Sequence, residues 1–222
     1  MPTLIAFDLD GVLYTSEPFI ADAYREATEL VNAQRLRSFA RLPDAHEILQ
    51  HVGWPVQTIV ARLFPTADSE AVALLHEILL DVICNRVNAR AGRLYDAVPD
   101  ALGSLHEAGH LLAVASNGRR RYVEAVLATY GLAELFVTPI TADQLGDKSA
   151  LLREYADRHR VTPGHMVMVG DRASDVEAAR AIGCHFIGCD YGHGHRQEIA
   201  GAGPVVSAFN EVPSAVAYLL HF

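Results

Sequence analysis

The sequence predicts an α/β protein: a parallel sheet flanked by helices, with an all-helical domain inserted into it. From residue 97 onward, short apolar runs of strand length alternate with amphipathic helical stretches, which is typical of βαβ units. One more apolar run, at residues 3–8, opens the chain, whereas residues 15–92 show helical spacing throughout. We therefore expect a core domain built from residues 1–14 and 93–222, with residues 15–92 inserted as a helical domain.

The inserted region should contain a series of helices. Pro18 suits the first turn of the first helix. Asp44, followed three residues later by Glu47, has the pattern of a capping box at the start of the second. A long stretch with apolar residues every three or four positions closes the region. The expected helices span residues 18–38, 42–52, 56–64 and 69–90.

In the core region, glycines mark where helices should end. Gly109, Gly131 and Gly183 each follow a helical stretch, as glycine does at many helix C-termini. The expected helices span residues 98–108, 120–130, 148–159 and 174–182, and a further pair lies within residues 194–222. The expected strands span residues 3–8, 110–116, 135–141, 165–171, 185–190 and 205–206.

The composition points away from nucleic acids and membranes. The net charge is −9, so the overall field of the protein repels both nucleic acid and anionic lipid surfaces. No apolar run reaches the length of a membrane span, and no signal peptide is recognisable at the N-terminus. Cys84, Cys184 and Cys189 are widely spaced and fit free thiols in a reducing compartment. We expect a cytoplasmic protein that acts as a monomer or a homodimer.

Four polar sites follow predicted strands, at the edge where the strands end. In open α/β sheets ligands bind in the crevice outside these ends, so we expect the four sites to converge in one cleft. One of them, Lys148, is the only lysine among 222 residues, in a chain that otherwise uses arginine for its basic side chains. The sites are Asp8 with Asp10, Ser116 with Asn117 and Gly118, Lys148, and Asp171 with Asp175.

The pair Asp8 and Asp10 raises a geometric question. Side chains two positions apart point to the same side of an extended chain only while the strand is regular. The predicted strand ends at Asp8, so its geometry does not determine where the Asp10 side chain points. Gly11 follows at once and permits a turn that can redirect Asp10 toward the group that Asp8 contacts. The pair is therefore expected where the buried strand emerges at the cleft.

The residue types at these sites favour phosphoryl chemistry. Several carboxylates in close quarters repel one another and need a compensating cation. Oxygen ligands without histidine or cysteine select a hard ion, and Mg²⁺ is the usual choice when two or three protein oxygens contribute. A lysine ammonium and a serine hydroxyl suit the remaining phosphate oxygens. One carboxylate can attack phosphorus, and a second can carry a proton to the leaving group and then activate water.

Four sequence motifs, in this order, resemble those of the haloacid dehalogenase superfamily of phosphohydrolases. They are "DLDGVL" at residues 8–13, "ASNG" at 115–118, Lys148, and "GDRASD" at 170–175, and the resemblance covers essentially the whole chain. It implies a Rossmann-like core, a helical cap domain at residues 15–92 and Mg²⁺ as the cofactor.

The resemblance also implies roles for the charged residues. Asp8 would be the nucleophile and a Mg²⁺ ligand. Asp10 would act as general acid and base, and its backbone carbonyl would contact the ion. Asp171 would be the third Mg²⁺ contact, and Asp175 would support Lys148 or a metal-bound water. The intermediate would be an aspartyl-phosphate on Asp8.

The phosphoryl group itself would be held by two of the motifs. By the resemblance, Ser116 bonds the phosphoryl group, with Asn117 and Gly118 beside it. Lys148 neutralises the charge of that group and orients Asp8. These residues form the expected substrate-binding set.

The sequence narrows the choice of activity within the superfamily. Asp10 disfavours a dehalogenase, which has no alkoxide to protonate, and a transport ATPase, which has threonine at that position. The inserted region holds no lysine, which excludes the Schiff base of a phosphonatase. We expect a phosphatase acting on a small phosphorylated metabolite, similar to the phosphoglycolate phosphatase branch. A phosphomutase similar to β-phosphoglucomutase, and a catalytically inactive binding or scaffold module, are the alternatives.

Two further features each have two interpretations. His193 and His195, in a glycine-rich loop, fit a metal site or, as we expect, a loop at the rim of the cleft. Trp54 fits the core of the inserted domain. It also fits a loop that closes over the substrate, with His51 or Gln57 contacting the leaving group.

Overall fold

The chain forms two compact units, Met1–Thr15 with Leu94–Phe222, and Ser16–Arg93. The computed structural model describes residues 3–35 and 38–220, so the ends of the predicted core domain and part of the predicted helix 18–38 lie outside the described residues. The predicted α/β fold is confirmed. The predicted domain boundaries, after residues 14 and 92, stay a prediction.

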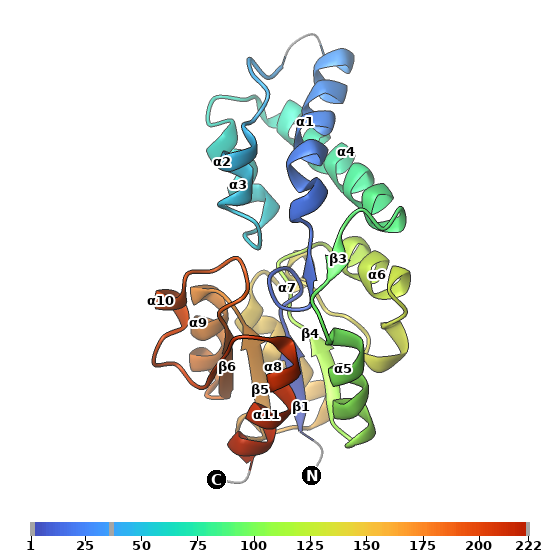
Figure 1. Cartoon of the computed structure of the whole chain (residues 1–222). Coiled ribbons are helices and arrows are strands. Elements are labelled where there is room, and N and C mark those ends of the chain that lie inside the picture. The colour runs from blue at the N-terminus through green and yellow to red at the C-terminus, as the bar shows by residue number, and fades with distance from the viewer. Residues whose placement is uncertain (1–2, 36–37, 221–222) are drawn as a thin grey trace. The chain divides into compact units, whose positions relative to one another are not determined.

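A parallel sheet forms the centre of the larger unit (Figure 1). Its strands are β1 (Leu4–Phe7), β4 (Leu111–Val114), β5 (Met166–Gly170), β6 (His185–Cys189) and β7 (Val205–Val206). Among the described residues their order is β4, β1, β5, β6, β7. Phe7 pairs with Val114 on one side and Val169 on the other, so the ends of β1, β4 and β5 lie level. Every residue of β1 is buried, as expected for a parallel strand covered on both faces.

Helices cover this sheet (Figure 1), and most begin and end within a residue or two of the predicted positions. The α-helices of this unit are α5 (Val98–Glu107), α6 (Arg120–Thr129), α7 (Ala142–Leu145), α8 (Lys148–His159), α9 (Ala173–Ile182), α10 (Arg196–Ile199) and α11 (Val212–Leu220). Short 3-10 turns are η1 (Ala133–Leu135), η2 (Pro163–His165) and η3 (Phe209–Glu211). Where the chain leaves this unit and returns to it, β2 (Tyr14–Thr15) pairs with β3 (Arg93–Leu94).

The strand predicted at residues 135–141 is absent from the described structure, so this prediction is wrong. After η1 the chain touches the sheet through an isolated bridge between Phe136 and Leu112. The Val137 amide donates to the Leu112 carbonyl oxygen at 2.8 Å, and the pairing then ends. Pro139 has no amide hydrogen to contribute to a strand ladder, which explains why the apolar run does not extend as a strand.

Tyr155 of α8 fixes this segment instead. The Tyr155 side chain is fully buried, and its hydroxyl accepts a hydrogen bond from the Ile140 amide at 2.8 Å. The same hydroxyl donates to the Val114 carbonyl oxygen, at the end of β4, at 3.0 Å. Burial raises the pKa of Tyr155 to about 12, so the hydroxyl keeps its proton and remains a donor.

Helices and the loops between them make up the described part of the smaller unit, as predicted, up to Arg93, which belongs to β3. Its helices are α1 (Glu17–Gln34), α2 (Ala45–Leu49), α3 (Val56–Leu63) and α4 (Ser69–Asn88). α1 packs against α4, and the buried faces include Ala27 and Val31 of α1 and Leu75 and Leu79 of α4. No helix in the described part of the chain has both the length and the apolar composition needed to cross a bilayer.

The start of α2 carries the predicted capping box. The His46 amide donates to Oδ1 of Asp44 at 2.8 Å, and the Asp44 amide donates to Oε2 of Glu47 at 3.0 Å. These two bonds satisfy amides that a helix leaves unpaired at its N-terminus. The same device, in a simpler form, starts α4, where Oδ1 of Asp68 accepts from the Ala71 amide at 2.8 Å.

Trp54, between α2 and α3, packs within the helical unit. Its ring makes an edge contact with His51 at 4.9 Å between centroids, and the Arg62 guanidinium lies 4.6 Å from the ring centroid. Such a cation over an indole is attracted by the negative face of the ring. These contacts fit the structural interpretation of Trp54, and contact with a substrate stays a prediction.

We expect Tyr155→Phe to lower the free energy of unfolding by about 1–3 kcal/mol, because two buried backbone groups lose their partner. Urea unfolding followed by circular dichroism measures this change. Tyr218→Phe is the matched control, since Tyr218 is 60% exposed on α11, and we expect it to stay within about 0.5 kcal/mol of the parent. A Tyr155→Phe variant as stable as Tyr218→Phe would contradict this role.

Candidate active site

The ends of three neighbouring strands bring predicted site residues together. Asp8 follows β1, Ser116 lies two residues beyond β4, and Asp171 follows β5. The Asp8 amide donates to the Val169 carbonyl oxygen at 2.9 Å, which ties the start of the site to the sheet. Because these strands end level, the side chains emerge at one edge, where α/β sheets bind their ligands.

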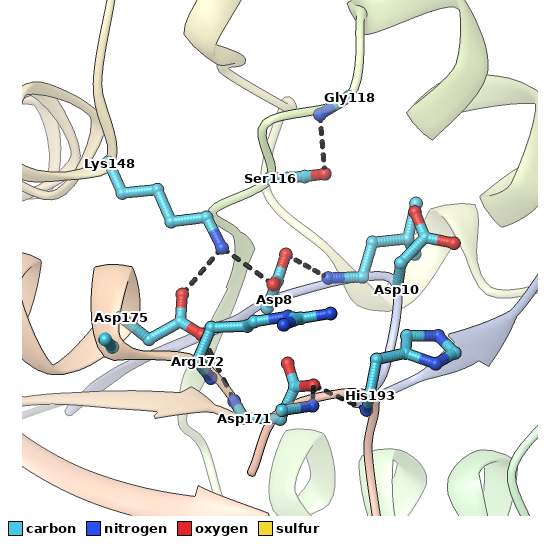
Figure 2. A network of polar contacts seen from close by, with 12 residues as sticks. Asp8, Asp10, Ser116, Gly118, Lys148, Asp171, Arg172, Asp175 and His193 are labelled. Carbon is cyan, nitrogen blue, oxygen red and sulfur yellow. Dashed lines mark hydrogen bonds and ion pairs between the residues drawn. The ribbon is translucent and has the colours of Figure 1, made fainter. Parts of the chain in front are cut away.

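Lys148 lies between two carboxylates at the centre of the site (Figure 2). Its Nζ is 2.7 Å from Oδ2 of Asp8 and 2.6 Å from Oδ1 of Asp175. Each of these side chains is at most 3% exposed. Lys148 is the first residue of α8, and Asp147 caps that helix by accepting a hydrogen bond from the Ala150 amide at 2.9 Å. The helix start therefore sets where the ammonium group lies.

The charges in this cluster affect one another. Burial raises the pKa of Asp8 well above its usual value, Lys148 opposes this rise, and the charges of Asp175 and Asp171 add to it. Burial, with a contribution from Asp175, also raises the pKa of Asp171. Burial alone would lower the pKa of Lys148, but the charges of Asp175 and Asp8 raise it above its usual value. Three buried carboxylates thus lie around one ammonium group, and a further cation would favour the ionised forms of Asp8 and Asp171.

Both oxygens of Asp175 are engaged within the protein. Oδ1 faces Lys148, and Oδ2 accepts hydrogen bonds from the amides of Asp171 at 3.1 Å and Arg172 at 3.0 Å. These amides stand at the N-terminus of α9, so Asp175 caps the helix that carries it. A side chain at Gly170 would collide with Asp175, which explains the glycine at the end of β5.

Asp171 is held by backbone amides of the glycine-rich loop that follows β6. Its Oδ2 accepts from the His193 amide at 2.7 Å and from the Gly194 amide at 2.9 Å (Figure 2). A side chain at Gly192 would meet Oδ2 of Asp171 at 2.5 Å, and one at Gly194 would collide with the Asp171 carbonyl oxygen. The loop can approach this closely only because both positions are glycine.

The carboxylates fit a hard cation. Oxygens of Asp8, Asp171 and Asp175 all lie within 4.8 Å of one another. Oδ1 of Asp171 is buried and makes no hydrogen bond to any described residue, so it is available to a metal ion. Asp175 is less suited to direct ligation, because its two oxygens already have partners. An all-oxygen set of this kind suits Mg²⁺.

Asp10 is turned toward α6. Gly11 has a φ of +88°, the left-handed conformation expected of the turn after β1. The hydroxyl of Tyr122, on α6, donates to Asp10, with its oxygen 2.8 Å from Oδ1 and 3.0 Å from Oδ2. In Figure 2, Asp10 lies beside Asp8, on the side away from Asp175. Tyr122 escaped the sequence analysis because nothing in "RRRYV" indicates a partner 112 residues away.

Ser116 lies at the edge of the same cluster. Its side chain is buried, and its Oγ accepts a hydrogen bond from the Gly118 amide at 2.9 Å (Figure 2). The loop through Asn117 is thereby closed on itself. All four predicted polar sites thus lie within one part of the larger unit.

Arg172 was also missed, although it stands inside the motif "GDRASD". Only 7% of the residue is exposed, and Figure 2 shows its side chain reaching past Asp8 and Asp171. One guanidinium nitrogen lies 3.8 Å from Oε1 of Glu198. Glu198 in turn accepts from the Ala173 amide at 3.0 Å, at the start of α9. The sequence signal that could have identified Arg172 is its position between Asp171 and Asp175, two acids that the motif predicts to lie at the site.

A parallel sheet with a buried lysine and buried carboxylates at its carboxyl edge fits a hydrolase of the haloacid dehalogenase type. Residues 2–183 match the haloacid dehalogenase-like hydrolases, and the chain belongs to this family. The membership predicted from the sequence motifs, and with it the prediction of an enzyme, is confirmed.

Particular relatives carry more specific names. A phosphoglycolate phosphatase of Vibrio vulnificus (strain CMCP6) is 31% identical over 211 residues, which cover 90% of this chain and 89% of that protein. Two solved structures share the fold. A predicted phosphoglycolate phosphatase from Haemophilus somnus has a TM-score of 0.83 at 22% identity, over 96% of this chain and 97% of that one. CbbY from Rhodobacter sphaeroides, in complex with phosphate, has a TM-score of 0.81 at 21% identity, over 96% of both chains.

We expect Gly194→Ala to lower the free energy of unfolding by about 1–3 kcal/mol, because the new side chain displaces the loop and the buried Asp171 carboxylate loses two amide donors. Gly103→Ala is the control, since a side chain at Gly103 in α5 meets nothing within 4 Å. It should stabilise the protein by about 0.5–1 kcal/mol, the usual gain for this change inside a helix. Thermal and urea unfolding measure both, and equal effects of the two changes would contradict the proposed packing.

Proposed function

We propose that this protein is a Mg²⁺-dependent phosphatase that hydrolyses a small-molecule phosphate monoester through an aspartyl-phosphate on Asp8. The observation that carries the proposal is the buried carboxylate of Asp8, 2.7 Å from the Lys148 ammonium and close to Asp171, whose Oδ1 is free of hydrogen bonds to described residues. A carboxylate beside a fixed cation and a metal site is suited to attack on phosphorus.

The metal site would be formed by one oxygen each of Asp8 and Asp171 and by the backbone carbonyl of Asp10. When bound there, Mg²⁺ would supply positive charge to the oxygens of the transferring phosphoryl group. Asp175 would act differently, by holding Lys148 at 2.6 Å and keeping its ammonium group directed at Asp8. This division of roles follows from the contacts that already occupy both Asp175 oxygens.

The remaining phosphoryl oxygens would be bound by Ser116, the Asn117–Gly118 loop and Lys148. A hydroxyl, backbone amides and an ammonium group provide donors for the charge that develops at phosphorus. Asp8 would attack phosphorus through a carboxylate oxygen. The bond from phosphorus to the ester oxygen then breaks, and that oxygen takes a proton from the carboxyl group of Asp10.

Hydrolysis of the intermediate would reverse the role of Asp10. Water attacks phosphorus while the Asp10 carboxylate takes one of its protons, and the bond between phosphorus and Asp8 breaks. The products are the alcohol and inorganic phosphate, and both aspartates return to their starting forms. We further propose that residues 15–92 form a cap domain, since the unit Ser16–Arg93 is compact and contains the helices α1, α2, α3 and α4.

The relatives support a small substrate. A relative named phosphoglycolate phosphatase matches this chain over 90% of its length at 31% identity. We propose that the substrate belongs to the same chemical class, a short phosphorylated metabolite. A general acid such as Asp10 would serve a leaving oxygen that needs a proton, and a phosphate monoester provides such an oxygen.

We expect Asp8→Asn to lower kcat on p-nitrophenyl phosphate by about a thousand-fold or more, because an amide oxygen is a poor nucleophile. The fold should survive, since burial disfavours the ionised form of Asp8 and asparagine has the same shape. Asp157→Asn, an exposed change on α8, is the control and should keep the parent rate. Parent-like turnover by Asp8→Asn would exclude the aspartyl-phosphate.

A panel of phosphate esters assayed with Mg²⁺, and again after chelation by EDTA, tests the function and the cofactor together. The panel contains phosphoglycolate, sugar phosphates, nucleoside monophosphates and β-glucose 1-phosphate. We expect phosphate release with Mg²⁺, a loss of about a hundred-fold or more with EDTA, and recovery when Mg²⁺ is restored. Formation of glucose 6-phosphate from β-glucose 1-phosphate would instead support a phosphomutase. Metal binding without activity on any ester would support a binding module.

A further inference from the structure

Tyr122 links two parts of the site that the proposed mechanism treats separately. Its hydroxyl oxygen lies 2.8 Å from Oδ1 and 3.0 Å from Oδ2 of Asp10. Its ring lies against Gly118: a Cβ added there would be 2.8 Å from Cδ1 and 3.4 Å from Cε1 of Tyr122. Gly118 belongs to the loop that also carries Ser116, and its amide donates to the Ser116 Oγ at 2.9 Å. Tyr122 therefore contacts both the loop proposed to bind phosphate and the acid proposed to protonate the leaving group.

The position of this hydroxyl is well fixed. Tyr122 is 8% exposed and belongs to the first turn of α6, where its amide donates to the Arg119 carbonyl oxygen at 2.9 Å. An aromatic side chain has only two rotatable bonds, so a ring packed against backbone has little freedom left. Asp10 stands in the turn beyond the end of β1, where it forms an isolated bridge with Tyr14. Both of its carboxyl oxygens lie within hydrogen-bond distance of the fixed Tyr122 hydroxyl.

The geometry points to Tyr122 as a positioning residue for Asp10, and this inference rests on the proposed function of Asp10 as general acid and base. The phenol proton can be shared between the two carboxyl oxygens, since both are within hydrogen-bond distance. When Asp10 carries a proton on one oxygen, the other can still accept from Tyr122. The same contact therefore orients the carboxyl group before and after it transfers its proton, and Tyr122 itself neither gains nor loses one.

Loss of the Tyr122 hydrogen bond to Asp10 should slow the reaction only of esters with poor leaving groups. Orientation of Asp10 matters when the departing oxygen needs a proton, and it matters little when that oxygen is already a stable anion. The ratio kcat/KM reports events up to departure of the leaving group, so it isolates this step from hydrolysis of the intermediate. A purely structural role of Tyr122 would lower kcat/KM for all esters alike.

The test compares two aryl esters, p-nitrophenyl phosphate and phenyl phosphate, whose leaving groups differ mainly in basicity. For Tyr122→Phe, with Mg²⁺ present, we expect kcat/KM to fall about ten-fold for phenyl phosphate and to stay within about two-fold for p-nitrophenyl phosphate. Tyr122→Phe keeps the ring over Gly118 and removes only the hydroxyl. Tyr155→Phe is the matched control, because it removes a buried, hydrogen-bonded hydroxyl outside the site, and it should leave the ratio of the two rates unchanged.

Two further variants separate this inference from the proposed function. Asp10→Asn should lower kcat/KM more for phenyl phosphate than for p-nitrophenyl phosphate, and the double variant with Tyr122→Phe should be no worse than Asp10→Asn alone. If Asp10→Asn discriminates between the esters and Tyr122→Phe does not, the inference is wrong and the function of Asp10 stands. If Asp10→Asn lowers both rates equally, the acid role of Asp10 is wrong and the inference fails with it. Additive losses in the double variant would also overturn it.

Discussion

The site depends on one buried ammonium group between two buried carboxylates. Lys148 contacts Asp8 and Asp175 at hydrogen-bond distance, and none of the three has appreciable exposure to water. Buried charges of like sign are costly unless a partner is placed with good geometry. Two backbone features provide that placement: β1 ends level with its neighbours, and α8 starts at Lys148 under the cap of Asp147. The sheet register and one helix terminus thus determine the electrostatics of the site.

Much of this arrangement could be predicted because it follows from local rules. Alternating strands and helices imply a parallel sheet, and the carboxyl ends of parallel strands share one edge. Asp8, Ser116, Lys148 and Asp171 were placed in one cleft on that ground. The apolar run at residues 135–141 does not extend as a strand, because Pro139 within it lacks the amide hydrogen that a strand ladder needs. Tyr155, which secures that segment through its hydroxyl, lies on a helix that follows it in the chain.

Other features could not be predicted because they depend on how elements pack across long sequence distances. Tyr122 reads as one apolar position of an amphipathic helix, and its contact with Asp10 depends on the direction in which α6 leaves the sheet edge. Arg172 was visible in its motif, but the proximity of its guanidinium to Glu198 depends on where α10 lies. His193 is conspicuous in the sequence for its imidazole, whereas its backbone amide makes the hydrogen bond to Asp171. In each case the sequence shows the type of residue, but it does not show which residue that side chain or amide contacts.

The loop that holds Asp171 meets two requirements at different positions: amides that donate hydrogen bonds to the carboxylate, and residues without a side chain that would collide with it. The hydrogen bonds to Asp171 come from main-chain amides, which every amino acid except proline carries. The close approach of the loop to Asp171 depends on Gly192 and Gly194. A substitution at position 193 therefore changes the side chain that the loop presents without removing the hydrogen bond from the amide of that residue to Asp171. At Gly192 and Gly194 the opposite holds, because any added side chain there would meet Asp171. Adjacent positions of one short segment thus differ in how much sequence variation they tolerate.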